Sequence, residues 1–291
     1  MGSGVRGGQG GIRSVSPEDG WVEVAAGLRL HYLDWGTPGR PPVLFLHGGS
    51  AHARWWDFTI PLLVERFRCV ALDLRGHGES GRPADGDYGL PAHAADVAAV
   101  VDALDLRGGA VVGHSFGGWV AMVYAGAAAG DLGALAILDS RPQIGVRSAR
   151  MLEALRKLPP TRYATRADAI SRFRLLPAAT IAAPDVVAHV AAHGIIEDAE
   201  GMHLPRFDRR ALAGAGPQDL TPHLRAARCP ILAVRAALSE IVDAAALQAY
   251  RDAVPSAELA EIAGAHHHLM LDQPAAVADV LGRFLGRTLG R

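Results

Sequence analysis

The chain has 291 residues, of which 49% are hydrophobic and 20% are charged, so it can bury a sizeable core and is not a disordered protein. Its formal net charge is −1 and it has no basic stripe with interleaved aromatic residues, which argues against nucleic acid as a partner. It also lacks a run of about 18 apolar residues, so the sequence predicts no membrane-spanning helix and no membrane partner.

The start of the chain and its cysteines indicate the compartment. Residues 1–20 are rich in Gly and Ser and lack the apolar segment of a signal peptide, so we expect a flexible tail. Cys69 and Cys229 are the only cysteines, and two isolated thiols are typical of a reducing environment. Together these features predict a cytoplasmic protein.

From Trp21 onward, short apolar runs alternate with longer Ala-rich segments. The later runs are nearly continuous Val, Ile and Leu, which is typical of parallel strands buried on both faces. The pattern predicts eight strands, at residues 21–25, 28–35, 43–47, 69–74, 110–114, 135–139, 230–234 and 257–262. Helical spacing predicts helices at 91–105, 117–129, 244–253 and 275–286. This alternation indicates an α/β protein with a doubly wound sheet covered by helices.

The alternation is interrupted between residues 141 and 222. This segment has amphipathic stretches at about 147–157, 167–174 and 184–193, broken by prolines, and no convincing strand pattern. We therefore expect a helical insertion, or cap, packed over a core formed by residues 21–140 and 223–291. Insertions at the carboxyl edge of such a sheet are where ligands bind.

Residues 113–117, GHSFG, match the G-x-S-x-G pattern between a predicted strand and a predicted helix. Glycines on both sides of Ser115 permit a strained turn that lifts the hydroxyl above the sheet, near the positive end of the following helix. The alternative is that Ser115 is only a small residue in a tight turn. The strand-turn-helix context favours a nucleophile.

A second stretch, VLFLHGGS at 43–50, is a strand followed by His-Gly-Gly. Small residues there leave room for a backbone N–H to face the same point as the N–H of Phe116. Gly49 and Phe116 are the predicted donors of an oxyanion hole, with Ser50 as the alternative to Gly49. An ordinary strand-end turn is the simpler interpretation. LDLRGHGES at 72–80 indicates a compact structural loop, in which His77 packs rather than acts as a base.

The segments LFLHGG, DLRGHGES, GHSFGG and AGAHHHLMLDQP, in this order, resemble the α/β-hydrolase superfamily. The resemblance covers about residues 21–140 and 223–289. It implies a mostly parallel eight-stranded sheet flanked by helices, with residues 141–222 as the family's helical cap. It also implies the order nucleophile, acid, histidine along the chain.

Residues 266–268 offer three consecutive histidines for the general base. Similar enzymes place the catalytic histidine seven residues before a proline that opens the last helix, and Pro274 then implies His267, with His266 as the alternative. Three adjacent histidines also suggest a metal site. Consecutive residues chelate one ion poorly, and no Cys or acid stands at metal spacing, so we expect no metal.

The acid departs from the family pattern. Its usual place, in a pattern like V-x-G-x-x-D, reads VRAALSEIVD at 234–243, with Ser239 in the acid's position. A serine cannot hold an imidazolium as a carboxylate does. Glu240 stands one residue after the acid's usual position. Some relatives, including certain haloalkane dehalogenases, carry the acid after the preceding strand, where this chain has Asp139. We expect Asp139 to be the acid, with Glu240 as the alternative.

These residues predict a serine hydrolase that cleaves a carboxylic ester, or a related acyl bond, of a small molecule without a cofactor. A carboxylate in place of Ser115 would have indicated an epoxide hydrolase or a dehalogenase. Other activities of the scaffold stay open: amide, lactone or carbon–carbon bond hydrolysis, perhydrolysis and cofactor-free dioxygenation. A ligand receptor of low turnover is a further alternative. No sequence feature indicates an oligomeric state.

Substrate contacts should come from aromatic and basic residues near the cap. Trp55 lies close in sequence to the predicted oxyanion donors at 49–50, and Trp119 lies close to the turn at Ser115. We expect these tryptophans to line either the acyl pocket or the core. Arg172 and Arg174 stand among apolar residues of the cap. A guanidinium that faces the pocket would favour a substrate carboxylate, whereas the simpler interpretation is a pair of surface arginines.

Overall fold

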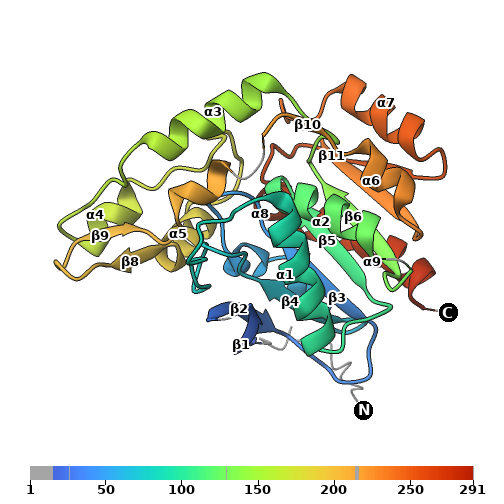
Figure 1. The fold of residues 1–291 in the computed structure, drawn as a ribbon, viewed down its shortest axis with the longest axis horizontal. Coiled ribbons are helices and arrows are strands. Elements are labelled where there is room, and N and C mark those ends of the chain that lie inside the picture. The colour runs from blue at the N-terminus through green and yellow to red at the C-terminus, as the bar shows by residue number, and fades with distance from the viewer. Residues whose placement is uncertain (1–15, 26, 129, 214–215, 291) are drawn as a thin grey trace, which may run out of the picture.

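The structure, a computed structural model, describes residues 16–25, 27–128, 130–213 and 216–290 (Figure 1). Its centre is an eight-stranded sheet in the order β1-β2-β4-β3-β5-β6-β11-β12. The strands are β1 (Glu18–Ala25), β2 (Leu28–Asp34), β3 (Pro42–Leu46), β4 (Arg68–Leu72), β5 (Ala110–His114), β6 (Ala134–Leu138), β11 (Ile231–Ala236) and β12 (Glu258–Ile262). They confirm the eight predicted strands and the α/β fold class.

The strand pairing determines where a ligand can bind. β1 pairs with β2, and β2 with β4, in antiparallel fashion, whereas all other neighbours in the sheet are parallel. After β3 the chain moves outward to β4 and then crosses back to β5 on the other side of β3. The strand order therefore reverses between β3 and β5. The crevice beyond the carboxyl ends of two such strands is where ligands bind in open α/β sheets.

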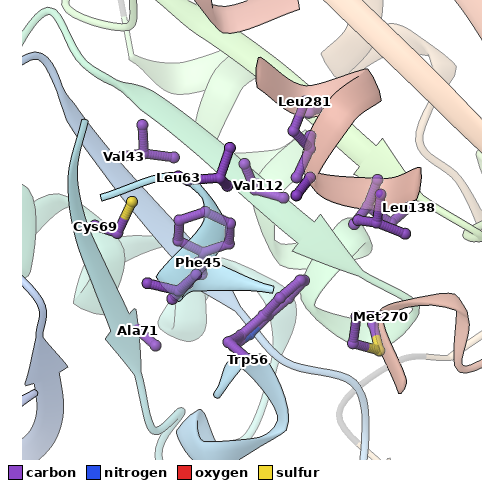
Figure 2. Close-up of a cluster of buried hydrophobic side chains, with 14 of the residues drawn as sticks. Val43, Phe45, Trp56, Leu63, Cys69, Ala71, Val112, Leu138, Met270 and Leu281 are labelled. Carbon is purple, nitrogen blue, oxygen red and sulfur yellow. The ribbon is translucent and has the colours of Figure 1, made fainter. Parts of the chain in front are cut away.

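Helices cover both faces of the sheet because alternate strand residues are apolar on each side. One face packs against α1 (Leu90–Ala103), α2 (Phe116–Ala127), α6 (Thr221–Ala226) and α7 (Ala244–Ala253). The other packs against α8 (Leu269–Asp272), α9 (Pro274–Thr288) and the short 3-10 helices η1 (Ala53–Trp56) and η2 (Ile60–Leu62). Figure 2 shows part of this second layer, in which Phe45 and Val112 of the sheet face Trp56, Met270 and Leu281.

The segment between β6 and α6 lies mainly at the upper left of Figure 1, on the side opposite the marked N and C ends. It contains α3 (Val146–Lys157), α4 (Arg166–Ser171), α5 (Pro184–His193) and the 3-10 helix η3 (Arg209–Ala213). The prediction that it lacks strands is wrong. β8 (Ile195–Glu197) pairs with β9 (His203–Pro205), and β7 (Gln143–Ile144) pairs with β10 (Gln218–Asp219). Strands of two or three residues are too short to show an alternating pattern.

One other difference concerns the start of an element. β1 begins at Glu18, three residues before the predicted strand, so Glu18–Gly20 belong to the sheet and not to the predicted tail. Residues 1–15 of that tail lie outside the described residues. Across the described ranges, no helix combines the length and the apolar character that crossing a bilayer requires.

Candidate active site

Ser115 occupies the sharp turn between β5 and α2. Its backbone has φ 51° and ψ −116°, a conformation that non-glycine residues rarely adopt, so the surroundings must hold the turn in place. Close packing does this. A Cβ on Gly113 would lie 2.3 Å from the carbonyl oxygen of Gly117, and a Cβ on Gly117 would lie 2.4 Å from that of His47. Glycine is therefore required on both sides of the serine.

A continuous chain of hydrogen bonds links Ser115, His267 and Asp139. Ser115 Oγ lies 3.0 Å from His267 Nε2, and His267 Nδ1 lies 2.7 Å from Asp139 Oδ2. Asp139 is fully buried and His267 is 5% exposed. A carboxylate only accepts hydrogen bonds, so the imidazole proton resides on Nδ1 and Nε2 is free to accept from the serine hydroxyl. The structure thus brings together the three residues that the sequence singled out.

Asp139 is held in place by β11, the strand beside its own. It follows the last residue of β6 and has a positive φ of 45°. Its Oδ1 accepts the backbone N–H of Ala236 at 3.0 Å, and its Oδ2 accepts the hydroxyl of Ser239 as well as His267. The carboxylate is therefore satisfied although it is buried, as a charge in a protein interior must be.

Glu240, the alternative acid, lies elsewhere. Its side chain is exposed, and in the described part of the chain it makes no hydrogen bond or ion pair with His267. Ser239, which stands in the family's usual position for the acid, instead donates to the carboxylate of Asp139. The extra residue that separates Glu240 from that position turns its side chain toward solvent.

Two backbone N–H groups lie beside the serine. Phe116 is the first residue of α2, so its N–H has no partner inside the helix. A Cβ on Gly49 would lie 3.8 Å from the Cβ of Phe116, and no acceptor in the described residues takes the N–H of Gly49. Ser50, the alternative donor, already gives its N–H to Nε2 of His77 at 3.2 Å. Gly49 and Phe116 therefore have the free N–H groups that an oxyanion hole needs.

Two buried, neutral histidines, His47 and His77, form hydrogen bonds that hold the backbone at residues 48–50 in place. His47 donates from Nδ1 to the carbonyl of Gly48 at 2.7 Å and accepts the N–H of Leu74 at Nε2, 3.0 Å away. Burial lowers the pKa of His47 to about 3 and also lowers the pKa of His77. Both rings therefore stay neutral at ordinary pH, and each keeps one donor and one acceptor nitrogen. His77 is a loop residue, not a base.

His114, His267 and His268 form a buried cluster in which one ring nitrogen from each lies within 4.8 Å of the others. His114 Nε2 donates to the carbonyl of His267, and His268 Nε2 donates to that of Pro177, both at 2.9 Å. Their Nδ1 atoms are buried without a partner in the described residues. Since His267 uses both nitrogens for Ser115 and Asp139, a metal ion bound by all three histidines would have to break the triad. The alternative base, His266, makes no hydrogen bond to the serine.

A cavity of about 280 Å³ lies between the loop after β3, at Gly49 and Ser50, and the segment expected to be the cap. Its wall includes Gly49 and Trp55. Trp55 also belongs to the buried core, so both of the roles considered for it from the sequence apply. Trp119 is not part of this wall, and its indole N–H donates to the carbonyl of Arg141 at 2.9 Å. The cap contributes apolar side chains together with Arg172, Arg174 and Arg209.

Sequence reasoning missed two of these residues. Arg209 stands in a segment without periodicity, and its neighbours in the wall come from distant parts of the chain, so no local signal identifies it. Ser239 was recognised only as a departure from the family pattern. Its hydroxyl is the expected partner for an acid that has moved to the adjacent strand, and β6 and β11 were recognisable as strands, so this role could have been inferred.

Comparison with known proteins agrees with the fold. The profile of the α/β hydrolase fold family matches residues 41–274. A non-heme chloroperoxidase of Streptomyces lividans is 38% identical over 131 residues, which cover 44% of this chain and 47% of the relative. A bifunctional esterase/perhydrolase of Acinetobacter calcoaceticus is 39% identical over 122 residues, 42% of this chain and 44% of the relative. The chain thus aligns with less than half the length of these curated relatives.

Solved structures extend the likeness across the whole fold. The crystal structure of E-2-(acetamidomethylene)succinate hydrolase superposes with a TM-score of 0.82 at 23% identity, covering 94% of this chain and 100% of that one. An identity this low is evidence for the shared fold only. The profile match, by contrast, covers most of the sequence and includes the strand-turn-helix around Ser115. This chain belongs to the α/β hydrolase family.

Proposed function

We propose that this protein is a serine hydrolase that cleaves a carboxylic ester, or a related acyl bond, of a small molecule through an acyl-enzyme. The observation that carries the proposal is the unbroken hydrogen-bond chain from Ser115 through His267 to the buried Asp139. In such a chain the histidine acts as a base toward the hydroxyl, and the carboxylate fixes its tautomer and stabilises the cation that forms.

In the acylation half, Ser115 Oγ attacks the substrate carbonyl while its proton passes to His267 Nε2. The carbonyl oxygen becomes an oxyanion and accepts hydrogen bonds from the N–H groups of Gly49 and Phe116. His267 then gives the proton to the leaving oxygen, the bond between the carbonyl carbon and that oxygen breaks, and the alcohol departs. Asp139 remains ionised throughout.

In the deacylation half, water attacks the ester carbonyl of the acyl-enzyme and His267 takes its proton. A second oxyanion forms in the same place. The bond to Ser115 Oγ breaks, the serine recovers a proton from His267, and the carboxylic acid is released. The proposal assigns no step to a metal or a cofactor, because each proton has a protein group to carry it.

Perhydrolysis is a second candidate because a bifunctional esterase/perhydrolase and a non-heme chloroperoxidase are among the similar proteins. Hydrogen peroxide would then replace water in attacking the acyl-enzyme, and a peracid would leave. Epoxide hydrolases are also similar over about a third of this chain. The resemblance implies a carboxylate nucleophile for that branch, and Ser115 stands in its place here, so we do not propose epoxide hydrolysis.

The decisive experiment is steady-state and burst-phase hydrolysis of 4-nitrophenyl butyrate, together with mass spectrometry of the protein during turnover. We expect a butyryl adduct on Ser115 and sustained release of 4-nitrophenol. Ser115→Ala should abolish both, whereas Ser256→Ala, at an exposed serine far along the chain, should leave both intact. One acylation without turnover would contradict a hydrolase and support a receptor.

A further inference from the structure

Among the described residues, the wall of the cap cavity includes three arginines and no carboxylate. Nineteen of these residues line the cavity, most of them apolar, and Arg172, Arg174 and Arg209 are the only charged ones among them. In the described part of the chain, none of the three has an acidic oxygen within 4.0 Å. Arg172 and Arg174 are exposed and Arg209 is half-buried, so the apolar wall strengthens their interaction with an anion to the extent that the bound ligand excludes water.

Other arginines of the same segment differ in their pairing. Three of them pair with carboxylates: Arg156 with Glu153, Arg162 with Asp198 and Arg210 with Asp208. Arg166 instead donates to the backbone carbonyls of Ala192 and Ile195. The cavity arginines are therefore distinguished by their place in one apolar wall rather than by the lack of an acidic neighbour.

The three guanidiniums also keep donors available. Arg209 is half-buried, donates one Nη1 bond to the carbonyl of Leu155 at 3.3 Å and has a buried Nε without a partner in the described residues. Among the described residues, Arg174 donates only from Nη1, to the carbonyls of Ser171 and Phe173. The side chain of Arg172 makes no hydrogen bond to any of the described residues. A guanidinium has five N–H donors, so each residue retains capacity for an anionic oxygen.

We propose that this cavity binds the acyl part of a substrate that ends in a carboxylate, so that the natural substrate is a half-ester, or related acyl derivative, of a dicarboxylic acid. The proposal rests on the proposed function. The oxyanion of the acyl group must lie against Gly49, and Gly49 is itself part of the cavity wall. The acyl chain therefore extends from Gly49 into the apolar cavity, and its terminal carboxylate meets Arg172, Arg174 and Arg209 as charge-assisted hydrogen-bond donors.

The test compares two esters that have the same leaving group and the same six-carbon acyl chain, namely mono-4-nitrophenyl adipate and 4-nitrophenyl hexanoate. We expect kcat/KM for the adipate ester to exceed that for the hexanoate ester by about tenfold or more, since one charge-assisted hydrogen bond contributes at least this factor. Raising the salt concentration to about 1 M should shrink the ratio because it screens the charges.

Arg172→Gln, Arg174→Gln and Arg209→Gln should each lower this ratio, mainly through a higher KM for the adipate ester. Arg147→Gln is the matched control: Arg147 is an exposed cap arginine outside the cavity wall, and its loss should leave the ratio unchanged. A wild-type protein that hydrolyses hexanoate as well as adipate would overturn the carboxylate proposal and leave the hydrolase proposal standing. A wild-type protein that hydrolyses neither ester would overturn both.

Discussion

Ser239 donates its hydroxyl to the same Asp139 oxygen that accepts from His267. Ser239 also accepts the backbone N–H of Ile241 at 3.0 Å, so its own orientation is set by the loop after β11. The position where the family usually carries its acid therefore holds a group that supports an acid on the neighbouring strand. The Ser239 hydroxyl thereby offsets part of the cost of burying the Asp139 carboxylate, which is fully buried.

Replacing Asp139 should damage catalysis far more than replacing Glu240. Asp139→Asn keeps the shape but presents an amide to His267, so we expect kcat to fall by about 10³- to 10⁴-fold on 4-nitrophenyl butyrate. Glu240→Gln should remain within about twofold of wild type, as expected for an exposed side chain outside the site. If Glu240→Gln proved the more damaging change, Asp139 would not be the acid.

A carboxylate at position 239, where the family usually carries its acid, should be able to replace that of Asp139. In an Asp139→Ala background, Ser239→Asp places a carboxylate next to the vacated space, on the loop that already reaches it. We expect the double variant to recover kcat by about tenfold or more over Asp139→Ala, because the new charge restores the imidazole tautomer. Asp139→Ala with Ser239→Asn has nearly the same volume without the charge and should recover nothing. Equal activity of the two double variants would argue against an electrostatic role.

Buried histidines should make the protein unstable in mild acid. Burial lowers the pKa of His52 to about 4 and that of His268 to about 3, whereas an unfolded histidine titrates near 6.5. Between these values the unfolded chain binds more protons than the folded one, so the free energy of unfolding decreases as the pH falls below about 6.5. Urea unfolding at several pH values from about 7.5 to 4.5 measures this slope.

His52→Gln provides the control for that experiment. Its amide can still donate to the carbonyl of Val190, as His52 Nε2 does at 2.9 Å, but it does not titrate. The slope should become shallower by up to about 1.4 kcal/mol per pH unit, the contribution of one proton. An unchanged slope would mean that His52 binds protons equally in the folded and unfolded states, which would contradict the prediction.

The sharp turn at Ser115, between β5 and α2, should not tolerate a methyl group at Gly117. Its Cβ would lie 2.4 Å from the His47 carbonyl oxygen, so Gly117→Ala must displace either the oxyanion loop or the serine. We expect a loss of about 1–3 kcal/mol in the free energy of unfolding and a larger relative loss of esterase activity. A Cβ at Gly216 meets no atom of the described residues within 4 Å, so Gly216→Ala should retain both stability and activity. Thermal melting and steady-state kinetics measure the two effects.

Chelators should leave activity unchanged. Both ring nitrogens of His267 are already used, toward Ser115 and Asp139, so the proposed mechanism requires no metal at the histidine cluster. Dialysis against EDTA, followed by elemental analysis, checks this. A loss of esterase activity that added Zn²⁺ restores would show that the cluster holds a metal needed for catalysis.

The sequence predicted the fold because its dominant elements produce strong local signals. A parallel strand buried on both faces must be a continuous apolar run, and the strained turn at Ser115 needs glycine at fixed positions. The short strands of the cap have no such requirement, because two or three residues pair without a buried face. The cavity wall is harder still. Arg172 and Arg209 are 37 positions apart and meet at one cavity only through tertiary packing.

The pairing of β7 with β10 brings together the points where the chain leaves and rejoins the core, with Ile144 opposite Gln218. The two ends of the cap are thereby fixed side by side, whatever lies between them. Lengthening a segment whose ends are already joined costs little entropy, since closure depends only on the logarithm of its length. We therefore expect insertions, deletions and exchanges within this segment to leave Ser115, Asp139 and His267 in place while they alter which substrates the protein accepts.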